Sequence, residues 1–144
     1  MDDRFSRQAD IVPRERILDC KATVIGVGAI GRQVASQLAA IGLPWMQLVD
    51  HDVVEESNIA SQGYFEDDLT RFKVHATADI CHQTNPKLEL YTINERFKRS
   101  SIVSNCVFCC VDKIETRRHI WDAVKDKANF FVDGRMSAEV LRVI

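Results

Sequence analysis

The sequence predicts a doubly wound α/β fold, in which a mainly parallel sheet carries helices on both faces. Short apolar runs alternate with amphipathic stretches along the chain, which gives a β-α-β rhythm. The apolar run over residues 22–27 leads into Gly26-Val27-Gly28-Ala29-Ile30-Gly31, a Gly-x-Gly-x-x-Gly turn that continues as a helix. We therefore expect one Rossmann-like domain over residues 1–144, with residues 1–12 as an N-terminal arm.

The three glycines of this turn have separate physical roles. Gly26 permits a tight turn from strand to helix, Gly28 lets a phosphate approach bare backbone, and Gly31 lets the helix pack closely on the strand. The start of the helix offers unpaired N–H groups and a partial positive charge to that phosphate. Asp50 ends the next strand about twenty residues further on, where a carboxylate binds ribose hydroxyls. The pattern indicates a nucleotide-binding unit and suits NAD as well as ATP.

The other elements follow from apolar periodicity and helix boundary signals. We expect helices over residues 13–20, 29–41, 69–83 and 115–127, and strands over residues 22–27, 46–50, 88–93, 106–111, 129–132 and 138–144. Asp67 or Asp68 is expected to cap the helix over residues 69–83. The polar segment 51–62 is expected to run over the surface at the carboxyl end of the second strand, where ligands bind in such sheets.

Composition indicates a globular protein and excludes several classes. The chain is 46% hydrophobic and 28% charged, with a net charge of −2. Its charges are interspersed, so no basic stripe indicates nucleic acid, and no apolar run approaches the ~20 residues of a membrane helix. The five cysteines, an odd number, form no secretory disulfide framework, so we expect a cytoplasmic protein.

Two spacings resemble metal sites but are better explained otherwise. Cys106 and Cys109 have Cys-x-x-Cys spacing, yet residues three apart on a strand point to opposite faces, so we expect core packing. His75, Asp79 and His82 recur on one helix face, but no fourth ligand is evident. We expect that face to be solvated.

A second set of motifs lies outside the glycine turn. In chain order these motifs are Arg4-Phe5-Ser6-Arg7-Gln8, Val49-Asp50-x-Asp52-x-Val54-Glu55-x-Ser57-Asn58, Lys73, and Val111-Asp112 with Arg117 five residues on. Nucleotidyl transfer needs such groups, because charge on a leaving pyrophosphate must be neutralised by Lys, Arg and a carboxylate-bound metal. In order and spacing the motifs resemble the adenylation domain of the ThiF/MoeB/HesA family, the bacterial relatives of ubiquitin-activating enzymes.

The resemblance implies a nucleotide site built on the glycine turn. In that family the three glycines cradle the ATP phosphates and the residue at Asp50 binds the ribose, with the residue at Asp52 nearby. Residues at the positions of Asn58 and Lys73 hold the phosphates and stabilise charge while a carboxylate attacks the α-phosphate. The resemblance therefore implies ATP as the nucleotide.

The resemblance also implies a metal, a dimer and a protein substrate. Asp112 would coordinate Mg²⁺, and Arg7 would reach the γ-phosphate from the other subunit of a homodimer. The product would be an acyl adenylate on the C-terminal glycine of a ubiquitin-like or sulfur-carrier protein. The family also continues well past the strand that ends near Ile144, so the chain is expected to be truncated at its C-terminal end.

Two residues depart from the family pattern. Family members carry Asn-x-x-Arg-Gln where this chain has Asn58-Ile59-Ala60-Ser61-Gln62, so one phosphate-binding cation is missing unless Arg71 or another arginine replaces it. Lys113 stands where the family favours Asn. Two alternatives stay open: an NAD-dependent oxidoreductase domain, and a non-catalytic partner subunit of a heterodimeric activating enzyme, which Ser61 would explain.

Overall fold

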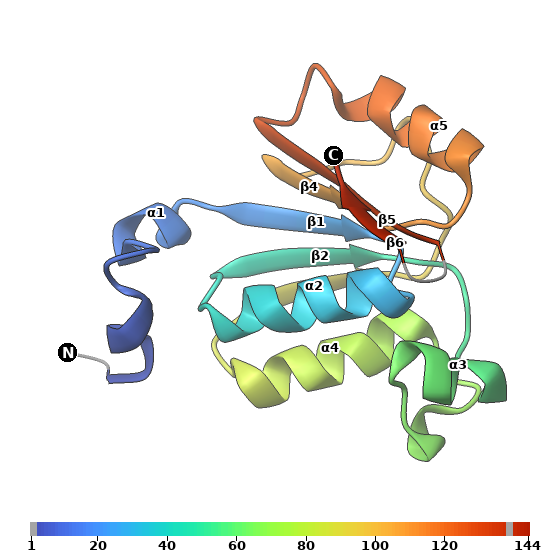
Figure 1. Cartoon of the computed structure of the whole chain (residues 1–144), viewed down its shortest axis with the longest axis horizontal. Coiled ribbons are helices and arrows are strands. Elements are labelled where there is room, and N and C mark those ends of the chain that lie inside the picture. The colour runs from blue at the N-terminus through green and yellow to red at the C-terminus, as the bar shows by residue number, and fades with distance from the viewer. Residues whose placement is uncertain (1–2, 138–139) are drawn as a thin grey trace.

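A six-stranded sheet forms the centre of the computed structural model, which describes residues 3–137 and 140–144 (Figure 1). Its strands are β1 (Lys21–Ile25), β2 (Trp45–Val49), β3 (Glu89–Ile93), β4 (Cys106–Cys109), β5 (Phe130–Ser137) and β6 (Val140–Val143). The strand order is β3-β2-β1-β4-β5-β6. Strands β1 to β5 pair in parallel, and β6 pairs antiparallel with β5.

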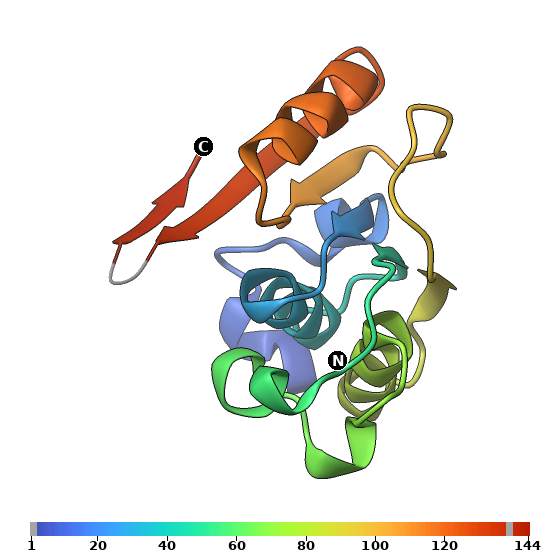
Figure 2. The same ribbon diagram turned by 90° about the vertical axis from the view of Figure 1, so that its right-hand side faces the viewer.

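Helices cover both faces of this sheet, so the predicted doubly wound fold is confirmed. The α-helices are α1 (Arg14–Leu18), α2 (Ala29–Ala40), α3 (Glu56–Gln62), α4 (Lys73–Thr84) and α5 (Ile114–Val124), and two short 3₁₀ helices are η1 (Asp3–Gln8) and η2 (Glu66–Asp68). Figure 2 shows α5 on one side of the sheet and α2 and α4 on the other.

The core lies on both faces of β1 because consecutive strand side chains point in opposite directions. Val24 packs in one buried cluster with Ala35 and Ala39 of α2, and Ile25 packs in another with Ile120 of α5. Burial on both faces explains why this strand is an unbroken apolar run. The small alanines of α2 let that helix lie close to the sheet.

The largest error in the sequence prediction concerns the start of α4. The helix expected over residues 69–83 begins at Lys73, and neither Asp67 nor Asp68 caps it. The Asp68 carboxylate instead accepts a backbone hydrogen bond at the start of η2. Thr70 then adopts a left-handed conformation with φ +68°. A helix cannot run through such a residue, so α4 starts after it.

The polar segment 51–62 runs over the surface, as predicted, and it contains α3, a helix that was not expected. Glu55 and Asn58 form a reciprocal capping box, in which the backbone N–H of Glu55 donates to Asn58 Oδ1 at 3.0 Å. Gly63, with φ +74°, ends the helix.

Strand β5 is also longer than expected. The strand expected over residues 129–132 continues to Ser137, and the last expected strand is β6, with residues 138 and 139 outside the described part. The other elements match the prediction to within about three residues at each end.

The N-terminal arm is anchored where the parallel strands begin. Gln8 Nε2 donates a hydrogen bond to the carbonyl of Ile41 at 2.9 Å, and Arg14 donates to the carbonyl of Gly42 at 2.7 Å. The Arg14 guanidinium also lies 4.4 Å from the centre of the Phe5 ring. Figure 1 shows this arm at the opposite end of the molecule from the tips of β1 and β2.

Cys106 and Cys109 pack on opposite faces of β4, as predicted. Val107 and Cys109 belong to the buried cluster under α5, whereas Phe108 packs against the cluster on the α2 side. Because side chains alternate along a strand, Cys106 shares the side of Phe108. All five cysteines are free thiols.

The side chains of His75, Asp79 and His82 on the polar face of α4 contact other protein groups. Asp79 forms an ion pair with Arg71 at 2.6 Å, and His82 Nε2 lies 3.2 Å from a backbone carbonyl. His75 packs edge-on against an aromatic ring at the helix start. Across the described part of the chain, no helix has both the length and the apolar character needed to cross a membrane.

Candidate active site

The backbone of the turn after β1 requires glycine at two positions. Gly26 has φ +85°, and a Cβ atom there would lie 2.9 Å from the carbonyl oxygen of Cys110. A Cβ atom on Gly31 would lie 1.7 Å from the carbonyl oxygen of Gly26, so the helix can approach the turn only without a side chain. Gly28 is less constrained, because a Cβ atom there would meet only the Gln62 side chain, at 3.6 Å.

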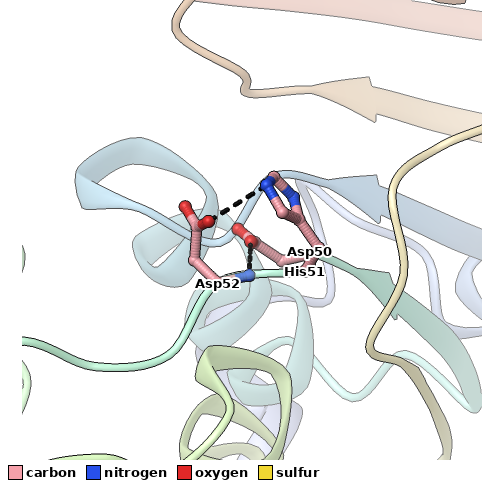
Figure 3. A group of neighbouring side chains, drawn as sticks. All are labelled: Asp50, His51 and Asp52. Atoms are coloured by element: carbon pink, nitrogen blue, oxygen red, sulfur yellow. Dashed lines mark hydrogen bonds and ion pairs between the residues drawn. The ribbon is translucent and has the colours of Figure 1, made fainter.

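Asp50 holds the glycine turn in place through both carboxylate oxygens. Oδ2 accepts the backbone N–H of Val27 at 2.8 Å, and Oδ1 accepts the N–H of Asp52 at 2.9 Å (Figure 3). From the other side, the hydroxyl of Tyr64 donates to the carbonyl of Val27 at 2.5 Å. Burial raises the pKa of Tyr64, which keeps this donor protonated. Each Asp50 oxygen retains acceptor capacity for a further hydroxyl.

Lys73 is a buried cation with a single, distant counterion. Its side chain is 8% exposed, and Nζ lies 3.7 Å from Asp52 Oδ2, which is its only ion pair within the described residues. The other oxygen of Asp52 lies 3.1 Å from His51 Nε2 (Figure 3). The backbone N–H of Lys73 donates to the carbonyl of Asp52 at 3.0 Å, which fixes the start of α4 against this segment. Most of the three donors of the ammonium group are therefore available to a ligand.

A pocket of about 610 Å³ opens where β1, β2 and β4 end, and its size is ordinary for a small-molecule site. Gly26, Gly28, Asp50, Asp52, Lys73 and Asp112 all line it. The structure therefore brings together most of the residues that the sequence predicted for the site. The pocket walls come from the glycine turn, the segments after β2 and β3, and the first turns of α4 and α5.

Three predicted site residues do not line the pocket. Gly31 is buried where α2 packs against the glycine turn. Asn58 does not line the pocket, because its side chain is engaged in the capping box of α3. Arg7 is exposed on η1, at the opposite end of the molecule from the glycine turn (Figure 1). Arg7 does not line the pocket of its own chain, so the role predicted for it calls for a second copy.

Arg71 does not replace the missing cation, which corrects one expectation. Its guanidinium pairs with Asp68 at 3.1 Å and with Asp79 at 2.6 Å, and it does not line the pocket. The hydrogen bond to Asp79 and the nearby carboxylates raise the pKa of Arg71. Ser61 is exposed and donates its hydroxyl to the carbonyl of Ser57 at 2.7 Å.

Two sets of carboxylates could hold a metal ion, and they differ in suitability. Asp50, His51 and Asp52 offer ligand atoms within 4.8 Å of one another. The ammonium of Lys73 lies beside Asp52 and would repel a second cation, so this trio suits a metal ion poorly. Asp112 is exposed at the pocket and forms no ion pair with any described residue. A free carboxylate next to a phosphate site fits Mg²⁺, which binds through one or two carboxylates plus phosphates.

Several pocket residues were missed by the sequence analysis. Arg96 and Phe97 follow β3, Lys113 precedes α5, and His119 lies on α5. The rings of Phe97 and His119 meet edge to face, with centroids 6.3 Å apart. The only available signal was position, because ligands bind outside the carboxyl ends of parallel strands.

The fold and the pocket define a doubly wound α/β protein with a polar ligand site at its glycine-rich strand-to-helix turn. Within this class the sequence identifies one family, because the model of the ThiF family matches residues 5–139. The chain therefore belongs to the ThiF family.

Curated relatives carry consistent names. The chain is 30% identical over 128 residues to the sulfur carrier protein ThiS adenylyltransferase of Escherichia coli, covering 81% of this chain and 51% of that protein. It is 32% identical over 106 residues to the SAMP-activating enzyme E1 of Haloferax volcanii, covering 69% and 39%. The chain thus spans about half, or less, of the length of these relatives.

Solved structures show the same fold. The crystal structure of Escherichia coli tRNA N6-threonylcarbamoyladenosine dehydratase, TcdA, in complex with ATP superposes with a TM-score of 0.83. The match covers 95% of this chain and 61% of that one, at 21% sequence identity. At this identity the likeness concerns the fold alone.

Proposed function

We propose that the chain is the nucleotide-binding part of an ATP-dependent adenylyltransferase, which activates the C-terminal carboxylate of a ubiquitin-like or sulfur-carrier protein. The observation that carries this proposal is that the buried ammonium of Lys73 and the free carboxylate of Asp112 both line the pocket at the glycine turn. Its relatives are named as adenylyltransferases or modifier-activating enzymes, which supports the same chemistry.

ATP is assigned to the pocket by its charge distribution. The N–H groups of the glycine turn and the start of α2 face the phosphates, and Asp50 accepts the ribose hydroxyls. Lys73 adds a positive charge beside the phosphates. Asp112 would hold Mg²⁺, which when bound neutralises charge on the phosphate oxygens.

The proposed reaction is a displacement at the α-phosphorus. A carboxylate oxygen of the carrier protein bonds to that phosphorus, the bond to the bridging oxygen of the β-phosphate breaks, and pyrophosphate leaves. The ammonium of Lys73 stabilises the charge that develops on the phosphate oxygens in the transition state. Because the ammonium is buried and fixed by the start of α4, it needs little reorganisation during the reaction.

The proposal includes a homodimer and a cytoplasmic location. Arg7 does not line the pocket of its own chain, which supports a dimer, because a second copy is then needed to bring this side chain to the γ-phosphate. The five free thiols favour a reducing compartment such as the cytoplasm. Asn58 is proposed as a phosphate contact only if ligand binding releases it from the capping box of α3.

Nucleotide choice tests the first requirement of the proposal. We expect ATP with Mg²⁺ to raise the melting temperature, because a ligand at 100 times its Kd adds about 2.7 kcal/mol to the stability. NAD⁺ at the same concentration should produce no shift. Stabilisation by NAD⁺ and not by ATP would overturn the proposal in favour of an oxidoreductase domain.

A further inference from the structure

Arg32, in the first turn of α2, is a buried cation without a counterion. The residue is 5% exposed, and its Nε and Nη2 atoms are buried with no hydrogen-bond partner. No carboxylate in residues 3–137 or 140–144 forms an ion pair with it. A buried charge without an ion pair is unfavourable, so an anion bound at this site would stabilise it.

Arg32 does not itself line the pocket, but it lies one turn from the glycine turn, next to the pocket residue Gln62. Its backbone N–H donates to the carbonyl of Gly28 at 3.0 Å, which places it one turn into α2. Helical side chains tilt toward the helix N-terminus, and here that end is the glycine turn. A cation at a helix N-terminus opposes the positive end of the helix dipole, and the first turn of α2 holds no acidic residue. This local excess of positive charge favours an anionic ligand.

The guanidinium of Arg32 lies against the chain that follows α3. Its carbon is 4.8 Å from the ring centre of Tyr64 and 5.6 Å from that of Phe65, and Nη1 lies 3.5 Å from the Cβ position of Gly63. The neighbouring residue, Gln62, lines the pocket, and its buried Oε1 also has no hydrogen-bond partner. Unpartnered polar atoms of α2 and α3 therefore lie together beside the glycine turn.

We propose that Arg32 binds the β- and γ-phosphates of the nucleotide and so supplies the cation that this chain lacks at Ser61. The inference rests on the proposed function. In the proposed site the glycine turn and the start of α2 hold the phosphates, so a cation in the first turn of α2 lies on the phosphate side of the nucleotide. Ser61 belongs to the same last turn of α3 as Gln62, so a cation from α2 and a cation from α3 would serve the same region.

The test compares Kd values for ATP, ADP and AMP by calorimetry in Mg²⁺ buffer. A charged hydrogen bond is worth about 1.5–3 kcal/mol, so Arg32→Met should weaken ATP binding by about 10- to 100-fold. AMP binding should change less than about twofold, because AMP lacks the outer phosphates. Arg32→Lys should retain part of the ATP affinity. Arg16→Met, which removes an exposed arginine at the far end of the chain, is the matched control and should change neither.

A purely structural role for Arg32 gives a different result. If the guanidinium serves only to hold Tyr64 and Phe65, Arg32→Met lowers the melting temperature and weakens ATP and AMP binding equally, which would overturn the inference. The double variant Arg32→Met/Ser61→Arg should recover ATP affinity if the two positions serve one phosphate region. If Arg32→Met does not fold, Arg32→Lys carries the same ATP-to-AMP comparison.

Inorganic tripolyphosphate separates this inference from the proposed function. If it stabilises the wild-type chain but not Arg32→Met, the anion site stands even where ATP fails to bind, and only the proposed function falls. If the wild type binds ATP and Arg32→Met binds it equally well, the inference falls and the proposed function stands. If the wild type responds to neither ligand, both fall.

Discussion

Asp50 shows how one residue can serve both folding and ligand binding. Its carboxylate ties the glycine turn to the segment after β2 through two backbone hydrogen bonds. The sequence predicted a carboxylate at this place from its spacing to the glycines, but not that its oxygens would organise the turn itself. Gly26 and Gly31 complete the arrangement, since each removes a Cβ atom that would strike the backbone.

Alanine at Gly31 should therefore reduce stability, whereas alanine at Gly28 should reduce nucleotide binding. Gly31→Ala places a methyl group against the carbonyl oxygen of Gly26, so we expect the free energy of unfolding to fall by about 1–3 kcal/mol or more. Gly28→Ala meets only a side chain, so we expect the fold to persist while the methyl group keeps phosphate away from the backbone. Urea unfolding measures the first effect and ATP titration the second. Equal stability of Gly31→Ala and the wild type would contradict this geometry.

At the scale of elements, the parallel strands were predictable and the segment between β2 and α4 was not. Strands buried on both faces leave long apolar runs, whereas α3 and η2 are short and polar. Asp68 has the sequence signal of a helix cap but accepts its hydrogen bond at η2, and four residues separate η2 from the start of α4. Aspartate favours any nearby turn that offers a free N–H, so its presence does not fix which turn it caps.

The outer wall of the pocket also could not be predicted from the sequence. The glycine turn, Asp50, Lys73 and Asp112 were found because they belong to motifs or strand ends. Phe97 and His119 were missed, because their meeting depends on how the segment after β3 folds toward α5. Sequence spacing gives no information on such contacts. The family motif also predicted Asn58 for the pocket, whereas the structure uses its side chain to cap α3.

At the scale of the whole molecule, the cysteine thiols in the buried clusters on the two faces of the sheet make the free energy of unfolding sensitive to alkaline pH. Burial raises the pKa of Cys81 and Cys110 to about 12 and that of Cys109 to about 11, above the ordinary value of 9.0. These folded-state pKa values are raised, so the thiols stabilise the fold fully below pH 9 and lose this contribution as pH rises toward 11–12.

We therefore expect the free energy of unfolding to fall between pH 9 and pH 11, by up to about 1.4 kcal/mol per pH unit for each thiol. Urea unfolding at pH 7.5, 9 and 10 measures this slope. Cys81→Ala should have a shallower slope than the wild type, whatever its absolute stability. A slope that is unchanged in this variant would show that the thiol of Cys81 does not contribute.

Carrier-dependent exchange of labelled pyrophosphate into ATP measures adenylyl transfer at this pocket. The assay uses a panel of ubiquitin-like and sulfur-carrier proteins that end in glycine. We predict exchange with at least one of them, a loss of about 10²- to 10³-fold in Lys73→Met, and no change in Lys87→Met, an exposed lysine beyond the end of α4. ATP binding without exchange for any carrier, or full exchange in Lys73→Met, would contradict the account.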